Sequence, residues 1–220
     1  MEGRATVIVG NGEPPPRALL LECLAGQPLI LCADGGANVV WDAGHVPDWV
    51  VGDLDSVRPE VLARVPAPHR VRVDADDTGT DLQKVLHQAL DLGVREAVLL
   101  GFTGRRVDHT LWNLGLLKAY GDCLALRLVD AHCDVRLIGA GIRFRAAIGQ
   151  KLSLCPLSGP VAEITTHGLR WPLKGEALAP GVKDGISNEV VANPVEIAVG
   201  SGDLLLCLQR EAGGGRIQVL

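Results

Sequence analysis

The feature that most constrains the fold of this chain is an alternation of short apolar runs and helical segments over its first 139 residues. Apolar runs rich in Val, Ile and Leu lie at 6–9, 29–33, 49–51, 71–73, 97–100, 124–129 and 135–138. Helices are predicted between several of these runs, at 17–24, 58–65, 80–90 and 108–120. Short buried strands that alternate with helices predict a parallel sheet with helices on both faces, which is an α/β fold.

The pattern changes near residues 139–141, where the sequence reads Gly-Ala-Gly. Beyond this point short β runs at 152–155, 161–165, 195–199 and 204–208 are separated by Gly and Pro, without an amphipathic helix of useful length. We therefore predict two domains. An α/β domain occupies residues 1–139, and an all-β domain, arranged as a sandwich, occupies residues 140–220.

Composition and charge argue against several classes of function. Aromatic residues make up 3% of the chain and the formal net charge is -5, whereas nucleic-acid binding favours aromatic platforms and basic faces. No stretch approaches the ~18 apolar residues that span a membrane, and the first five residues lack an apolar leader. The six cysteines form no CxxC pair. We therefore expect buried free thiols in a cytoplasmic protein, with no nucleic-acid or membrane partner.

The GDLDS motif at residues 52–56 carries two carboxylates, Asp53 and Asp55, directly after the apolar run at 49–51. If the extended backbone continues, both side chains point to the same side. Two like charges held close together are costly unless a cation relieves their repulsion, and Mg²⁺ prefers such oxygen ligands. A solvated turn with an Asx motif is the simpler alternative for an isolated DxD.

Another carboxylate follows the run at 29–33. Asp34 precedes two glycines, which would let a ligand approach the backbone closely. The alternative is a plain strand-to-helix turn with Asn38 as a cap.

The segment at 74–81 is acidic throughout. Thr80 and Gln83 fit a capping box, and Asp81 suits the positive end of the helix dipole, so these residues have sufficient structural roles. Asp76 and Asp77 have none, because acids placed in an already acidic loop cost energy unless a cation is nearby.

A glycine-rich loop at 101–106 follows the run at 97–100 and contains two arginines. Such a loop before a helix can bind an anion. Asp108 is placed to cap the helix, and His109 and Asn113 share one of its faces at i and i+4. For a single histidine a structural role is the commoner alternative.

These loops are expected to lie along one edge, because ligands of open parallel sheets bind beyond the carboxyl ends of the strands. Carboxylates there would hold Mg²⁺, while arginine and backbone N–H groups would neutralise the remaining phosphate charge. The residues thus predict phosphoryl or pyrophosphoryl transfer from a nucleotide, and they leave the acceptor open.

Six short motifs occur in order over nearly the whole chain. They are DGGAN at 34–38, GDLDS at 52–56, TD at 80–81, GRRVDH at 104–109 followed by Asn113, GLRWPL at 168–173 and SNE at 187–189. The ordered series resembles the thiamine pyrophosphokinase family. The resemblance implies a catalytic α/β domain that binds ATP and Mg²⁺, and a β-sandwich that binds thiamine and mediates dimerisation. It also implies a homodimer that transfers the pyrophosphoryl group of ATP to the thiamine hydroxyl and releases AMP.

The resemblance further implies roles for individual residues. Catalysis and metal binding would fall to Asp53, Asp55 and Asp81, with Asp77 as a further metal ligand. The ATP cleft would be lined by Asp34, Asn38, Ser56, Thr80, Arg106, Asp108 and His109. The thiamine pocket would contain Trp171, Ser187 and Asn188. From its sequence context alone, Trp171 fits either the core or a flat surface that faces a ligand.

One segment departs from the family pattern. The family places an Asp three residues before the Asp that follows Thr, whereas here Thr78 has that position and Asp77 lies one residue earlier. Gly79 could absorb the extra residue as a bulge. The alternatives are a pyrophosphokinase for another hydroxymethyl heterocycle, such as a pterin, and a relative that binds nucleotide or thiamine without turnover.

Overall fold

In the computed structural model, which describes residues 4–73, 79–210 and 218–220, the chain divides between Ala131 and His132 into two compact units. The division falls ahead of the boundary expected at residue 139. The reason is that strand β7 (Cys133–Ile138) pairs along its whole length with the late strand β14 (Leu204–Gln209).

The first unit contains a sheet of parallel strands, as predicted. Its order is β6-β5-β1-β2-β3-β4. The strands are β1 (Thr6–Val9), β2 (Leu29–Ala33), β3 (Trp49–Gly52), β4 (Arg70–Arg72), β5 (Glu96–Leu100) and β6 (Ala125–Val129). The chain builds outward from β1 to β4 and then returns to the other side of β1 to add β5 and β6. This reversal creates a topological switch point between β1 and β5, where such sheets bind ligands.

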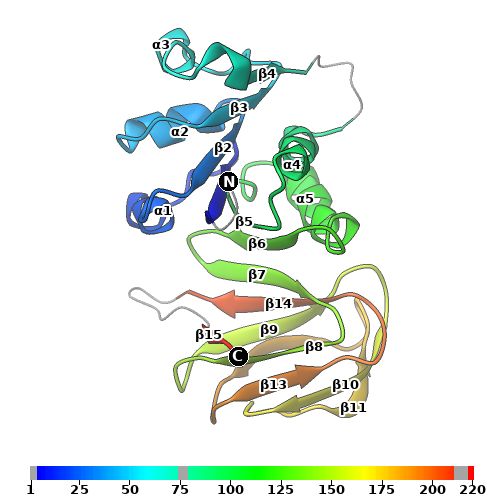
Figure 1. The fold of residues 1–220 in the computed structure, drawn as a ribbon. Helices are drawn as coiled ribbons and strands as arrows, with labels where there is room; N and C mark the ends of the chain where they lie inside the picture. Colours follow the sequence, from blue (N-terminus) through cyan, green and yellow to red (C-terminus); the bar gives the residue numbers. More distant parts are fainter. Residues whose placement is uncertain (1–3, 74–78, 211–217) are drawn as a thin grey trace. The chain divides into compact units, whose positions relative to one another are not determined.

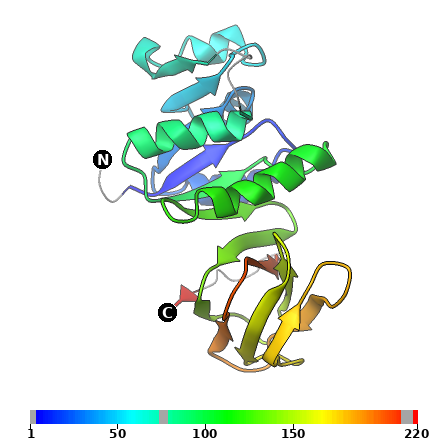
Figure 2. The ribbon, with the colours of Figure 1, turned by 90° about the vertical axis from the view of Figure 1, so that its right-hand side faces the viewer.

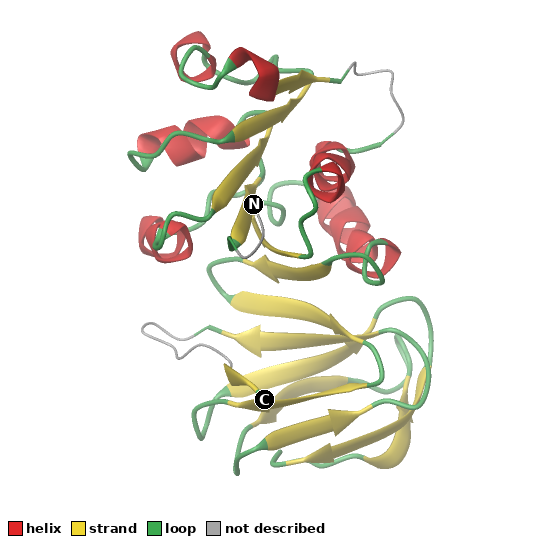
Figure 3. Cartoon of the chain, viewed as in Figure 1, coloured by secondary structure: helices red, strands yellow, loops and turns green. Residues whose placement is uncertain are grey.

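Helices cover both faces of this sheet (Figures 1 and 3). One face carries α1 (Arg17–Leu24), α2 (Gly36–Asp42) and α3 (Pro59–Leu62), and a 3₁₀ turn (Ala67–His69) precedes β4. The other face carries α4 (Asp81–Asp91) and α5 (Val107–Ala119), which Figure 2 shows from the front. In α4, Leu82, Val85, Leu86 and Ala89 are all buried and form one apolar face of the helix.

The second unit is the predicted all-β sandwich. One sheet has the order β12-β9-β14-β7 and the other β11-β10-β13-β8-β15, and every pairing within them is antiparallel. Besides β7 and β14, the strands are β8 (Gly141–Arg145), β9 (Lys151–Pro156), β10 (Val161–His167), β11 (Lys174–Leu178), β12 (Gly185–Glu189), β13 (Val195–Ala198) and β15 (Gln218–Val219). Alternate residues fill the space between the sheets, including Phe144, Leu154, Ile164 and Leu206.

All six cysteines are free thiols, but the expectation that they are buried is correct only for Cys32. Cys155 and Cys207 lie on neighbouring strands of the second unit and are partly exposed. Because side chains alternate along a strand, the core positions beside them belong to Leu154 and Leu206, and the thiols face outward. Among the described residues, no helix is both long and apolar enough to cross a membrane.

Candidate active site

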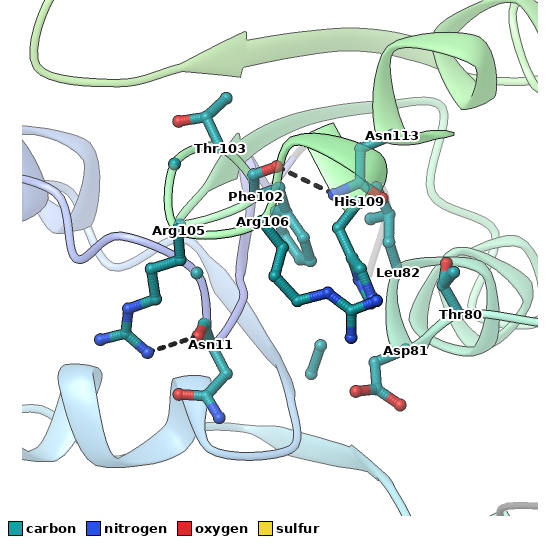
Figure 4. Close-up of a pocket in the computed structure, with 14 residues that line it drawn as sticks. Asn11, Thr80, Asp81, Leu82, Phe102, Thr103, Arg105, Arg106, His109 and Asn113 are labelled. Carbon is teal, nitrogen blue, oxygen red and sulfur yellow. Dashed lines mark hydrogen bonds between the residues drawn. The ribbon is translucent and has the colours of Figure 1, made fainter. Parts of the chain in front are cut away.

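A cavity of about 320 Å³ lies at the switch point of the parallel sheet. Asn11 and Gly12 reach it from the end of β1, and the loop at 101–106 reaches it from the end of β5. Ala33 at the end of β2, the first turn of α4 and the beginning of α5 complete its lining (Figure 4). The predicted convergence of the β5 loop and the start of α4 at one edge is therefore found in the structure.

A cluster of carboxylates lies at the same edge of the sheet. Asp34, Asp53 and Asp55 each place one carboxylate oxygen within 4.8 Å of the others. Asp34 is buried, Asp53 is half-buried and Asp55 is exposed. The residues meet because β2 and β3 are adjacent parallel strands, so the loops that follow them begin side by side. Sequence analysis assigned Asp34 to the ATP cleft, and the structure adds it to the candidate metal ligands.

The carboxylates of Asp53 and Asp55 converge through a turn, because the extended strand ends at Gly52 and does not continue between them. Leu54 between them has a φ of +64°, in the left-handed region. The Asp55 N–H donates to Asp53 Oδ1 at 3.3 Å, so the Asx interaction of the alternative interpretation is present together with the cluster. Asp34 also has a positive φ, +43°. Asp34 and Leu54 thus both have the strained left-handed backbone conformation, which is common at functional sites.

Asn38 ties the loop after β3 to the start of α2. Its Nδ2 donates to Ser56 O at 2.8 Å, and its Oδ1 accepts from Arg58 N at 3.0 Å. Ser56 in turn donates from its hydroxyl to Asp55 Oδ1 at 2.9 Å and from its backbone to Asp34 Oδ1 at 3.4 Å. Gly35, and not Asn38, occupies the N-cap of α2. Asn38 therefore positions the carboxylates, with both ends of its amide already engaged.

Asp81 belongs to the cluster electrostatically. Burial raises its pKa above the usual 3.8, Lys84 opposes that rise, and the negative charges of Asp34, Asp53 and Asp55 add to it. Lys84 Nζ lies 3.7 Å from Asp81 Oδ1, and its side chain is only 8% exposed. Lys84 was not among the predicted site residues, although its i, i+3 spacing from Asp81 on the predicted helix is a sequence pattern for an ion pair.

The predicted capping box at the start of α4 is present. Its Gln83 half is firm, since Oε1 accepts from Thr80 N at 3.0 Å and also from Trp112 Nε1 at 3.0 Å. The Thr80 half is weaker. Its hydroxyl oxygen is buried and makes no hydrogen bond of ordinary geometry to the described residues. Asp76 and Asp77 lie outside the described residues, so the metal role of Asp77 stays a prediction.

The two arginines of the β5 loop have different partners. Arg105 has a φ of +51° and donates to Asn11 O at 3.1 Å, which joins the loops that follow β1 and β5. Arg106 pairs with Asp108, and this contact raises the pKa of Arg106 and lowers that of Asp108 to about 2. The N-cap of α5 is Arg106, so the prediction that Asp108 caps the helix is wrong. Asp108 lies in the first turn, where a negative charge suits the helix dipole.

Two glycines at this edge are required by packing of the backbone. A Cβ on Gly36 would lie 2.1 Å from Val9 O, and a Cβ on Gly101, whose φ is +72°, would lie 2.7 Å from Gly10 O. Both distances are far below van der Waals contact. The glycines therefore let α2 and the β5 loop approach the end of β1, a role the sequence did not distinguish from approach of a ligand.

In the second unit, Trp171 is 56% exposed, which excludes the core alternative. The Arg170 guanidinium carbon lies 5.6 Å from the centre of its ring. Asn188 is buried and holds the Trp171 backbone, with Oδ1 accepting from Trp171 N at 3.1 Å and Nδ2 donating to Trp171 O at 2.7 Å. Ser187 is exposed, and its backbone N–H donates to Ser153 Oγ at 3.0 Å. Asn188 thus supports the loop that presents Trp171.

Comparison with known proteins gives a family for this architecture. The sequence model "Thiamin pyrophosphokinase, catalytic domain" matches residues 20–126, and "Thiamin pyrophosphokinase, vitamin B1 binding domain" matches residues 142–204. Thiamine pyrophosphokinase 1 of Arabidopsis thaliana is 30% identical over an alignment of 242 residues, and this alignment covers 97% of this chain and 89% of the relative. The chain belongs to the thiamine pyrophosphokinase family. This confirms the resemblance seen in the six motifs.

Solved structures of the family share the fold. Thiamine pyrophosphokinase from Bacillus subtilis superposes with a TM-score of 0.82 at 25% identity, covering 95% of this chain and 100% of that one. Thiamin pyrophosphokinase from Candida albicans superposes with a TM-score of 0.79 at 17% identity, covering 96% of this chain and 90% of that one. The family's catalytic-domain match contains the carboxylate cluster, and its vitamin B1 binding match contains Trp171, Ser187 and Asn188.

The donor set of the cluster fits a magnesium ion of the kind the thiamine pyrophosphokinase family implies. Every donor is a carboxylate oxygen, which is the ligand type that Mg²⁺ prefers. Ligands around Mg²⁺ lie roughly 3–4 Å from one another, given bond lengths of about 2.1 Å. The oxygens of Asp34, Asp53 and Asp55, within 4.8 Å of one another, need only a small closure to reach that geometry.

Proposed function

We propose that this chain is a thiamine pyrophosphokinase, which transfers the pyrophosphoryl group of ATP to the hydroxyl of thiamine and yields thiamine diphosphate and AMP. One observation carries the proposal. In a chain of this family, a cluster of three carboxylates lies beside a cavity of about 320 Å³ at the switch point of a parallel sheet. That volume is within the usual range for small-molecule sites.

Mg²⁺ is the proposed metal, held by Asp34, Asp53 and Asp55, with Asp81 and Asp77 as further ligands. When bound, it would neutralise part of the triphosphate charge as negative charge shifts to the leaving group. The electrostatic coupling of Asp81 to the cluster supports this arrangement, because the negative charges of Asp34, Asp53 and Asp55 add to the rise that burial gives its pKa.

The nucleotide is proposed to enter the cavity with its phosphates toward Arg106 and His109. The thiamine hydroxyl oxygen attacks the β-phosphorus, and the bond from that phosphorus to the oxygen shared with the α-phosphate breaks. That oxygen leaves with AMP. The hydroxyl proton passes to a nearby carboxylate. Catalysis then depends on positioning and charge neutralisation, without a covalent intermediate.

Other residues hold the reacting groups in place. Asn38, Ser56 and Thr80 fix the loops that carry the carboxylates. Asp108 orients the Arg106 guanidinium through their ion pair.

Thiamine is proposed to bind against the exposed ring of Trp171, close to Ser187. An electron-rich indole face suits the positive charge of the thiazolium ring. Asn188 keeps the Trp171 loop in position. We further propose a cytoplasmic homodimer in which both subunits contribute to each thiamine site. Six free thiols agree with a reducing compartment.

The test is product analysis after incubation of the full chain with Mg-ATP and thiamine. Equal amounts of AMP and thiamine diphosphate are expected, and both should disappear with a chelator or with Asp53→Asn. The matched control is Asp122→Asn, which changes an exposed carboxylate outside the cluster. AMP release with a pterin alcohol instead of thiamine would overturn the acceptor assignment. Nucleotide binding without turnover on any acceptor would identify a binding protein.

A further inference from the structure

One buried polar atom of the cavity lining has no hydrogen-bond partner among the residues that the structure describes. Asn113, on the second turn of α5, is only 5% exposed. Its Nδ2 donates to Phe102 O at 2.8 Å. Its Oδ1 is buried and has no partner among the residues that the structure describes. Because Phe102 O can only accept, the orientation of the amide is determined, and the acceptor atom is the one left over.

Asn113 is part of the cavity lining, in a largely apolar part of it. Figure 4 shows its amide nitrogen turned to the Phe102 carbonyl, and Leu82 lines the same cavity. Leu82 and Phe102 are both buried. Neither side chain can donate a hydrogen bond, so neither satisfies Asn113 Oδ1.

The position of Asn113 along α5 indicates which part of a nucleotide it meets. Arg106, at the N-cap, is seven residues earlier, which corresponds to about 10 Å along a helix. This length is comparable to the distance from the edge of a nucleobase to the nearest phosphate. With the phosphates at Arg106, the base reaches the apolar end of the cavity between Leu82 and Phe102.

We propose that Asn113 determines nucleobase specificity, with Oδ1 accepting a hydrogen bond from the exocyclic 6-amino group of adenine. This inference rests on the proposed use of a nucleotide. Adenine presents a donor at position 6, whereas guanine and hypoxanthine present a carbonyl oxygen there. A 6-oxo purine would place that oxygen against Oδ1, so two acceptors would face each other without a proton between them.

The Thr80 hydroxyl is a second buried oxygen in the same lining, without an ordinary bond to the described residues. A hydroxyl can donate or accept. It would adapt to either class of base, so discrimination depends on Asn113.

The experiment compares three nucleotides on the full chain by isothermal titration calorimetry, with Mg²⁺ and without thiamine. The three are ATP, inosine triphosphate with a 6-oxo group, and purine riboside triphosphate with no substituent at position 6. Both analogues should bind roughly tenfold more weakly than ATP, or weaker still. In Asn113→Ala the three dissociation constants should become equal. If the substitution loosens the loop after β5, it should weaken the binding of all three nucleotides alike. The ratios of their dissociation constants therefore still report discrimination between the bases.

Asn11→Ala is the control, since Asn11 lines the same cavity but is exposed and should leave the ratio unchanged. Equal binding of the three nucleotides by the unaltered chain would overturn the proposal and indicate that water satisfies Asn113 Oδ1. A preference that survives in Asn113→Ala would also overturn it.

A parallel assay of thiamine diphosphate separates this inference from the proposed function. Preferential ATP binding without product would support the role of Asn113 and refute the kinase activity. Product formed at equal KM from all three nucleotides would refute the role of Asn113 and support the activity.

Discussion

The carboxylate cluster should destabilise the metal-free protein. Asp53→Asn removes one of three negative charges while keeping Oδ1, which accepts the Asp55 N–H in the turn between them. The variant is therefore expected to be more stable than the unaltered chain in a chelator, although it should lose Mg²⁺ binding. A residue that lowers stability but is needed for function is a common trade-off at active sites.

The size of the effect follows from the geometry. The three oxygens lie within 4.8 Å of one another, and in water two unit charges at this distance repel by ~0.9 kcal/mol. Physiological salt reduces this to roughly half. Removing one charge abolishes two of the three pairs, which amounts to about 1 kcal/mol. For a chain of this size the melting temperature should rise by about 2–4 °C.

The assay is thermal unfolding in a chelator and then with increasing Mg²⁺. The unaltered chain should gain about 1.4 kcal/mol when Mg²⁺ reaches ten times its Kd, and Asp53→Asn should gain almost nothing. Adding monovalent salt to the metal-free samples should narrow the difference between them, because screening weakens the repulsion. Asp122→Asn should match the unaltered chain throughout, within about 0.5 kcal/mol.

Two results would refute this reasoning. A metal-free Asp53→Asn less stable than the unaltered chain would mean that Asp53 contributes more through contacts than it costs through repulsion. An equal response of both proteins to Mg²⁺ would mean that the metal binds elsewhere.

Three further predictions concern single residues. Asn38→Ala removes two hydrogen bonds to backbone, so it should cost about 1–3 kcal/mol in urea unfolding and weaken the Mg²⁺ response; an unchanged response would separate Asn38 from the cluster. The pKa of Asp81 is raised in the folded state, so the unaltered chain should lose stability relative to Asp81→Asn as pH rises above 3.8, and parallel pH profiles would contradict this. Contact with Cys207 lowers the pKa of the Cys155 thiol to about 7, so alkylation of Cys155 should be half-maximal near pH 7 and shift upward in Cys207→Ala; an unshifted midpoint would exclude that cause.

Two asparagines support residues that are proposed to contact ligand. Asn38 and Asn188 each use both ends of the amide on backbone groups, one beside the carboxylates and the other beside Trp171. Both belong to motifs that resemble the family's, and sequence analysis assigned both to ligand binding. Asn113 differs from them, because only one end of its amide is engaged among the described residues.

The sequence by itself determined the class of fold and the edge at which the chemistry lies. Apolar runs that alternate with helices up to residue 139 require a covered parallel sheet, and polar loops after β2, β3 and β5 must then meet at its carboxyl edge. The loss of helical periodicity afterwards determined the sandwich. These inferences depend on the local periodicity of apolar residues, which consecutive residues of the sequence show directly.

Only the tertiary structure decided how individual side chains are used. The buried Asp34 joined the cluster because β2 and β3 are neighbours, and Leu54 entered a left-handed turn that no strand pattern foretells. Asn113 Oδ1 has no partner among the described residues, because the loop after β5 engages only the other end of its amide, through Phe102 O. A side chain's partner depends on distances between segments far apart in the sequence, and these distances exist only after the chain has packed.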